Sequence, residues 1–285
     1  MTRHLFLILS AMICAPVLAQ EPLEQAGESF RITVFHESKS KGETSSSSSS
    51  GGHEYIERII ATSEAGVERI YDVPRDPDEE SRLIDWQFPV QVFEAKDGEL
   101  RIVNRGDLEA RRDAWLDVAE IPAEACGTWY FTWNAFQVEC DPDAILETIR
   151  TINIQALRLK EGEPFTHPAA SQPGNLQLLA KDGSKFRVEM IVDEDYFHRS
   201  EAKSDVIVGE IMREPVTFKE AYERRKAEKI TGSIEVVLTA TETGRVVRQV
   251  TSIKTTKIEI DGEEVKTTTT ETIDRKKWLA PPSIH

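Results

Sequence analysis

Alternation of apolar and polar residues predicts β-strands over much of this sequence, most clearly near its C-terminus. Three long segments there, 234–241, 245–260 and 264–273, are rich in Val, Ile and Thr, which favour strands. The pairs Thr243-Gly244 and Asp261-Gly262 separate them, and Gly-containing pairs between alternating segments are typical of hairpin turns. The C-terminal region is therefore expected to form three consecutive antiparallel strands.

Two further hairpins are expected earlier in the chain, where Asp-Gly pairs separate alternating segments. Asp97-Gly98 joins 90–93 to 100–103, and Asp182-Gly183 joins 176–179 to 186–192. Asp-Gly is among the strongest local signals for a two-residue turn. The remaining segments with a strand pattern are 30–35, 55–60, 67–73 and 206–208.

Helical spacing of apolar residues is found in three places, at 106–119, after Asp141-Pro142, and at 215–229. Asp is a favoured N-cap and Pro is favoured at the first helical position. The fold class predicted is α+β, with a mainly antiparallel curved sheet or partly open barrel and three to four packed helices. A division into two subdomains near Pro173-Gly174 remains an alternative.

The N-terminus has the layout of a secretory signal peptide. A basic start is followed by an apolar stretch from Leu5 to Ile13, and the small residue Ala19 precedes a polar segment. The apolar stretch is shorter than the roughly 20 residues that a membrane-spanning helix needs. We therefore expect cleavage after Ala19 and a periplasmic or secreted protein that is not an integral membrane protein.

The domain organisation expected after the signal peptide (1–19) is simple. Residues 20–29 are a polar leader, 30–274 a single α+β domain, and 275–285 a C-terminal tail. The Ser/Gly-rich segment 38–52 buries little and costs entropy to order, so it is expected to be a flexible loop or hairpin tip.

The charge of the chain argues against one class of partner. With 50 acidic and 35 basic residues, the net charge is −15. Such a surface repels phosphate backbones, and the densest basic stretches are flanked by acids, so no nucleic-acid partner is expected.

Two cysteines remain after the signal peptide, Cys126 and Cys140. In an oxidising compartment such a pair is most simply a disulfide. The bond requires the chain to reverse near Trp133-Asn134, because a straight strand would hold the two residues far apart. Two free or intermolecular thiols are the alternative.

An aromatic cluster is the best candidate for a ligand-binding surface. Its members lie within eight consecutive positions and are Trp129, Tyr130, Phe131, Trp133 and Phe136. Aromatic side chains commonly line apolar pockets. The alternative is a core hairpin packed against the helix that carries Ile145 and Ile149.

Signals for catalysis or metal binding are weak. None of the common nucleophile, phosphate-binding, dinucleotide or zinc-protease motifs occurs in the sequence. His36 and His53 flank the Ser-rich segment without a third ligand. No catalytic residue, metal or cofactor is therefore predicted, and an enzyme is the less favoured interpretation.

The function expected is that of an exported soluble binding protein of the cell envelope. It would hold an apolar or amphipathic ligand, such as a lipid, on its curved sheet. The alternatives are a structural or protein-interaction module of the envelope, with another envelope protein as partner, and a hydrolase whose site has no recognisable motif.

Overall fold

A single antiparallel sheet of ten strands organises the part of the chain that the computed structural model describes, residues 24–74, 79–131, 135–154, 159–181, 184–241, 245–258 and 264–278. Its order is β10-β11-β12-β13-β14-β1-β2-β3-β4-β5, so its two ends stay open and no barrel closes. In chain order the strands are β1 (Ser29–Lys41), β2 (Ser46–Thr62), β3 (Gly66–Asp72), β4 (Val90–Ala95), β5 (Leu100–Ile102), β10 (Gln177–Leu178), β11 (Lys185–Ile191), β12 (Glu228–Ala240), β13 (Val246–Ile258) and β14 (Glu264–Lys277).

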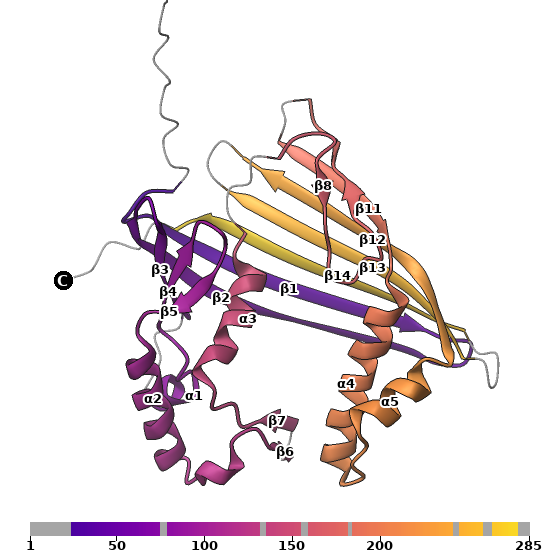
Figure 1. The fold of residues 1–285 in the computed structure, drawn as a ribbon, viewed down its shortest axis with the longest axis horizontal. Coiled ribbons are helices and arrows are strands. Elements are labelled where there is room, and N and C mark those ends of the chain that lie inside the picture. Colours follow the sequence, from indigo (N-terminus) through magenta and orange to yellow (C-terminus); the bar gives the residue numbers. More distant parts are fainter. Residues whose placement is uncertain are drawn as a thin grey trace, which may run out of the picture.

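The helices lie on one side of this sheet, in two groups under its opposite ends (Figure 1). Helices α1 to α3 gather below strands β3 to β5, and α4 and α5 lie below the other end of the long strands. Their bounds are α1 (Glu79–Ile84), α2 (Arg105–Val118), α3 (Ile145–Ile152), α4 (Glu194–Met212) and α5 (Phe218–Arg225). The predicted α+β class with an antiparallel sheet and packed helices is confirmed. Within the described residues, no helix is both long and apolar enough to cross a bilayer.

The centre of the sheet joins the two ends of the chain. Strand β1 pairs with β2 on one side and with the C-terminal strand β14 on the other. The hairpins expected at 90–103 and 176–192 are confirmed as β4-β5 and β10-β11. Gly98 has a φ of 86°, a left-handed conformation that suits glycine. The turn residues Asp182-Gly183 and those of the two C-terminal hairpins lie outside the described residues.

Two hydrophobic clusters fill separate parts of the space between the sheet and its helices. The first packs α2 and α3 against the sheet near Ile32 and Val92. The second packs β11 and β12 against the chain around Ala169 and Leu176. Between these two clusters, Arg248 and Ser252 of β13 and Thr269 and Glu271 of β14 belong to neither.

The Ser-rich segment corrects one expectation. Most of 38–52 is strand, because β1 and β2 extend to the hairpin end with a register from Glu37↔Ser50 to Lys41↔Ser46. Only the turn between Gly42 and Ser45 is a hairpin tip. Backbone pairing does not depend on the side chain, and β14 holds β1 from its other edge, so serine is accommodated in this ladder.

Helix α4 corrects a second expectation. Residues Val206 to Val208, predicted as a short strand, lie inside this 19-residue helix. Asp193 caps it by accepting hydrogen bonds from the backbone N–H groups of Asp195 and Tyr196. Burial of His198, Ala202 and Gly209 along one face then outweighs the strand preference of the β-branched residues.

A buried ion network near the start of β1 includes residues of the expected leader and tail. Glu24 lies within 2.7 Å of both Arg69 and Arg275, and Glu57 lies 2.9 Å from Arg69 and 2.6 Å from Arg275. Glu94 also pairs with Arg69. Both arginines and Glu57 are at most 2% exposed. The polar leader 20–29 and the tail 275–285 therefore each supply a charge to the folded structure.

Candidate functional site

A cavity of about 690 Å³ lies between the inner face of the sheet and helices α3 and α4. This volume falls within the range of about 300–1,000 Å³ that is usual for small-molecule sites. The floor consists of Arg248, Val250 and Ser252 of β13 and of Thr269 and Glu271 of β14. Alternate residues of a strand share a face, and the register Val250↔Glu271 and Ser252↔Thr269 places the two rows side by side.

Helix α3 forms one wall. The predicted cap is confirmed, because the Asp141 carboxylate accepts a hydrogen bond from Asp143 N–H at 2.9 Å in the 3₁₀ turn that leads into α3. The apolar side of α3 packs into the first hydrophobic cluster. Its polar side then directs Glu147, Arg150 and Thr151 to the cavity.

The segment after strand β8 (Pro164–Phe165) forms a second wall, since β8 pairs with β9 (Gly174–Asn175) and holds the chain close to the sheet. Phe165 and His167 line the cavity from this segment. The backbone N–H of Asp193 donates to Ala169 O at 2.8 Å, which ties the segment to the start of α4.

The first turns of α4 form the third wall with Tyr196, Phe197 and Ser200. The rings of Tyr196 and Phe197 meet edge to face with centroids 5.5 Å apart. This geometry is favourable for aromatic pairs and fixes the two rings relative to each other.

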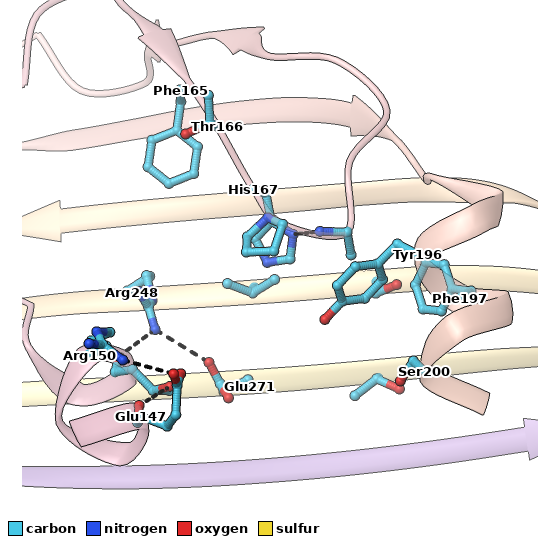
Figure 2. Close-up of a pocket in the computed structure, with 16 residues that line it drawn as sticks. Glu147, Arg150, Phe165, Thr166, His167, Tyr196, Phe197, Ser200, Arg248 and Glu271 are labelled. Carbon is cyan, nitrogen blue, oxygen red and sulfur yellow. Dashed lines mark hydrogen bonds and ion pairs between the residues drawn. The ribbon is translucent and has the colours of Figure 1, made fainter. Parts of the chain in front are cut away.

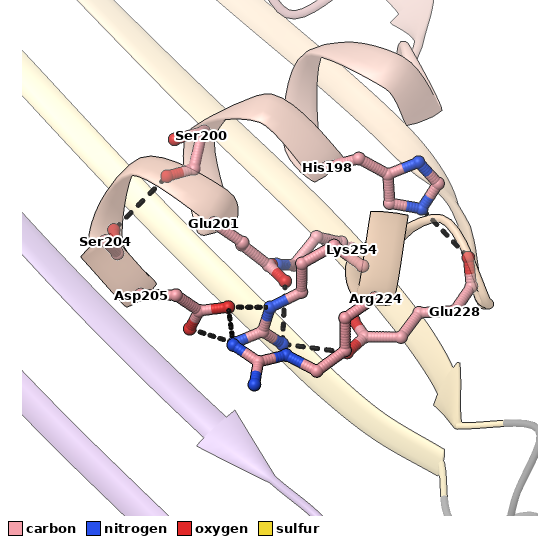
Figure 3. Close-up of polar contacts among 9 residues, drawn as sticks. His198, Ser200, Glu201, Ser204, Asp205, Arg224, Glu228 and Lys254 are labelled. Atoms are coloured by element: carbon pink, nitrogen blue, oxygen red, sulfur yellow. Dashed lines mark hydrogen bonds and ion pairs between the residues drawn. The ribbon is translucent and has the colours of Figure 1, made fainter. Parts of the chain in front are cut away.

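Ion pairs hold α4 in place beneath the sheet (Figure 3). Arg225 of α5 pairs with Asp205 at 2.6 Å and with Glu228 at 2.8 Å. On the sheet, Lys254 pairs with Glu201 of α4. Because these contacts connect α4 to α5, β12 and β13, the aromatic wall is anchored to the floor of the cavity.

The charged groups and the Tyr196-Phe197 pair occupy different ends of the cavity, whereas Phe165 lies away from that pair (Figure 2). Arg150, Arg248, Glu147 and Glu271 gather beside α3, whereas Tyr196 and Phe197 project from α4. Besides Phe165 and His167, the other lining residues are small, apolar or hydroxyl-bearing, and are Thr151, Thr166, Pro168, Ala169, Ser200, Val250, Ser252 and Thr269. The cavity is therefore amphipathic along its length.

His167 presents a hydrogen-bond donor between these ends. Burial and, secondarily, the positive charge of Arg248 lower the pKa of His167. The ring is therefore neutral at pH 7, and its Nδ1 accepts a hydrogen bond from Ala169 N–H at 3.2 Å. A neutral imidazole that accepts at Nδ1 carries its proton on Nε2.

Acidification is expected to destabilise the protein through His167. In the unfolded chain His167 binds a proton near pH 6.5, whereas in the folded protein its pKa is lower. The free energy of unfolding therefore decreases as pH falls from about 6.5 through the lowered pKa of the folded state. Urea unfolding at pH 7.5 and pH 5.5 measures this effect, and the loss should be smaller in His167→Gln. An equal loss of stability in the wild type and His167→Gln would contradict the role of His167 in this pH dependence.

The aromatic cluster lies on a small hairpin near α4. Strand β6 (Trp129–Phe131) pairs with β7 (Ala135–Gln137), and β6 contacts α4. The half-buried Trp129 is not among the residues that line the cavity. Trp133 and the side chains of Tyr130, Phe131 and Phe136 lie outside the described residues, so ligand binding by this cluster stays a prediction.

The Cys126–Cys140 disulfide is present, with the two Cα atoms 5.5 Å apart. Phe131 pairs with Ala135, and the predicted reversal at Trp133-Asn134 lies outside the described residues. The bond therefore closes the base of the β6-β7 hairpin.

The two histidines beside the Ser-rich segment do come near each other. His36 pairs with Gly51, and His53 pairs with Val34, so the histidines lie two positions apart on one sheet face. Among the residues that the structure describes, no group of three or more potential ligands surrounds a point where a metal ion would bind.

Sequence reasoning missed the cavity residues, which come from separate elements between Glu147 and Glu271. No single stretch contains more than five of them in a row. The alternation Arg248, Val250, Ser252 predicted a strand face, but nothing local showed that this face lacks an apolar cover.

Comparison with known proteins does not assign this chain to a family. No protein-family model matches it, and no curated protein is similar to it. Among solved structures, one concerning lipid–protein interactions in lipovitellin matches 92% of this chain with 9% identity and a TM-score of 0.34, and this chain spans only 26% of that one.

Two further solved structures are less similar. The attachment invasion locus protein Ail of Yersinia pestis, in complex with the heparin analogue sucrose octasulfate, has 5% identity and a TM-score of 0.16, with coverage of 88% of this chain and 99% of that chain. A conserved protein of unknown function with a hot dog fold from Alicyclobacillus acidocaldarius has 10% identity and a TM-score of 0.12, with coverage of 92% and 83%. Similarities this low carry no functional argument.

Proposed function

We propose that this protein is an exported binding protein of the cell envelope that holds an amphipathic small molecule in the cavity between the sheet and helices α3 and α4. The observation that carries this proposal is the separation of the charged groups beside α3 from the Tyr196-Phe197 pair of α4 within one cavity of about 690 Å³. A ligand with one polar and one apolar end matches this arrangement.

The apolar end of such a ligand lies against Tyr196 and Phe197, with Val250 beneath it. Aromatic walls with a few well-placed polar groups are the usual composition of ligand sites. The polar end lies beside α3, where charged side chains and the neutral His167 offer hydrogen bonds. Ion pairs and the capped start of α4 anchor the aromatic wall, which lowers the entropic cost of binding.

Export is part of the same proposal and rests on the first nineteen residues. Their basic start, apolar stretch and small residue at Ala19 are typical of a secretory signal peptide. The Cys126–Cys140 disulfide agrees with an oxidising compartment. N-terminal sequencing of the protein from the medium or periplasm of an exporting host should begin at Gln20, and retention of Met1 in that fraction would contradict cleavage.

Filling the cavity is expected to abolish ligand binding without unfolding the protein. Val250→Trp places a large ring over the middle of the cavity floor, where the existing space accepts it. The matched control is Thr251→Trp, because the next residue of the strand faces the opposite side of the sheet. The binding of a fluorescent fatty-acid analogue should weaken at least about tenfold, or about 1.4 kcal/mol, only in Val250→Trp.

Two results of this titration would contradict the proposed site. One is an unchanged affinity in Val250→Trp, and the other is an equal loss in both variants. Circular dichroism of each variant at the titration temperature confirms that the compared proteins are folded.

A further inference from the structure

We propose that the polar end of the ligand is an anionic headgroup, a carboxylate or a phosphate, held by Arg248 with support from Arg150. This inference rests on the proposed function, because it specifies the chemistry of the same cavity. The inference extends the proposed function by assigning a charge to the ligand and a role to each charged side chain beside α3.

Arg248 has donors that the protein does not use fully. Its Nη2 donates to Thr151 O at 2.8 Å and lies 3.5 Å from a carboxylate oxygen of Glu271. Its Nε is buried and meets no acceptor among the described residues. Guanidinium has five N–H donors in a planar fork, and a buried donor without an acceptor carries a free-energy penalty. An anion that reaches this fork removes that penalty.

The contact with Glu271 is too long for a strong charge-assisted pair, which is usually 2.7–2.9 Å. Glu271 therefore attracts Arg248 without occupying its fork. The Arg248 side chain is only 23% exposed, and burial lowers its pKa, with Glu271 acting in the opposite direction. A cation in such surroundings is stabilised by a closer anion.

Arg150 is available as a second cation at the same end. It pairs with Glu147 at 2.8 Å, but the two side chains are 52% and 81% exposed. Exposed ion pairs of this kind contribute little to the free energy of folding, and solvent competes with them readily. Arg150 is therefore free to turn from Glu147 to a ligand headgroup at small cost.

His167 adds a neutral donor rather than a third charge. Its Nδ1 is occupied by Ala169 N–H, so the proton on Nε2 is the group that it offers to the cavity. A carboxylate or a phosphate accepts hydrogen bonds from both guanidinium and imidazole N–H groups, whereas a quaternary ammonium headgroup accepts none.

Calorimetric titration with four decyl compounds tests this inference on the intact mature protein at pH 7.5 and low salt. Decanoate and decyl phosphate carry the two proposed headgroups, 1-decanol is neutral, and decyltrimethylammonium is cationic. We expect at least one anion to bind about tenfold tighter than 1-decanol, or about 1.4 kcal/mol, with the cation weakest. The tighter of decanoate and decyl phosphate identifies which anion the site prefers.

Variants then separate a binding role of Arg248 from a structural one. Arg248→Gln should weaken binding of the preferred anion about tenfold, or about 1.4 kcal/mol, and leave 1-decanol binding within about twofold. Glu271→Gln should strengthen anion binding, because it removes the competing carboxylate. Arg245→Gln is the matched control, since Arg245 precedes the same strand, is exposed and pairs with Asp274 away from the cavity lining.

The outcomes distinguish failure of this inference from failure of the proposed function. Equal binding of 1-decanol and both anions would overturn the anionic headgroup and leave an amphipathic cavity. Equal loss of every compound in Arg248→Gln, with no gain in Glu271→Gln, would show that Arg248 only holds α3. Binding of none of the four compounds would overturn both proposals.

Discussion

Replacement of Arg69 by methionine is expected to lower the free energy of unfolding by about 3–5 kcal/mol, the usual cost of removing one partner from a buried ion network. Arg69 is 2% exposed and contacts Glu24, Glu57 and Glu94. Without it, Arg275 remains the partner of both Glu24 and Glu57. Glu57 is 1% and Glu24 8% exposed, so little solvent is available to stabilise the excess negative charge of these two carboxylates.

Urea unfolding of the wild type and Arg69→Met measures this loss. The matched control is Arg187→Met, because Arg187 pairs with Glu235 across the sheet but is 36% exposed. An exposed pair is worth at most about 1 kcal/mol, so the control should lose little. A loss below about 1 kcal/mol in Arg69→Met would contradict the account of a buried network.

Loss of the disulfide is expected to cost about 3 kcal/mol, since the bond closes a loop of roughly 15 residues in the unfolded chain. The variant carries Cys126→Ser together with Cys140→Ser, which leaves no unpaired thiol in the mature chain. Reduction of the wild type should produce a similar loss, and reduction should not destabilise the variant further.

Thermal or urea unfolding under oxidising and reducing conditions checks this expectation. Equal stability of the oxidised wild type and the double variant would contradict the expected contribution of the disulfide. The comparison also bears on the cavity, because β6 contacts α4. A loosened hairpin should weaken ligand binding as well as stability.

Much of the sheet could be predicted because its signals are local. Asp97-Gly98 between alternating segments specified the β4-β5 hairpin, and Asp141-Pro142 specified the start of the helical turn before α3. The pairing of β1 with β14 could not be predicted, because these strands are joined by most of the chain and no local pattern encodes their register.

The errors share a physical cause, which is tertiary contact outweighing local composition. The serines from Ser46 to Ser50 pair because β1 is already held by β14. Val206 to Val208 are helical because the capped α4 buries its other face. The ion pair between Glu24 and Arg275 at 2.7 Å is likewise a tertiary contact that no local pattern encodes.

The cavity was beyond sequence reasoning for a related reason. Arg248 and Glu271 each look like an exposed strand residue, and only the arrangement of α3 and α4 around them creates a pocket. The aromatic cluster at 129–136 offered a stronger local signal, but Trp129 does not line this cavity. The local composition pointed to aromatic residues, which commonly bind apolar groups, but it could not show where in the fold the cavity-lining residues come together.

Native mass spectrometry of the mature wild type and Val250→Trp, both purified gently from an exporting host, tests the central claim most directly. The account predicts an additional mass in the range of an amphipathic small molecule on the wild type, lost on denaturation and absent from Val250→Trp. A wild type without any bound mass after incubation with host lipids, or an adduct retained equally by Val250→Trp, would contradict it.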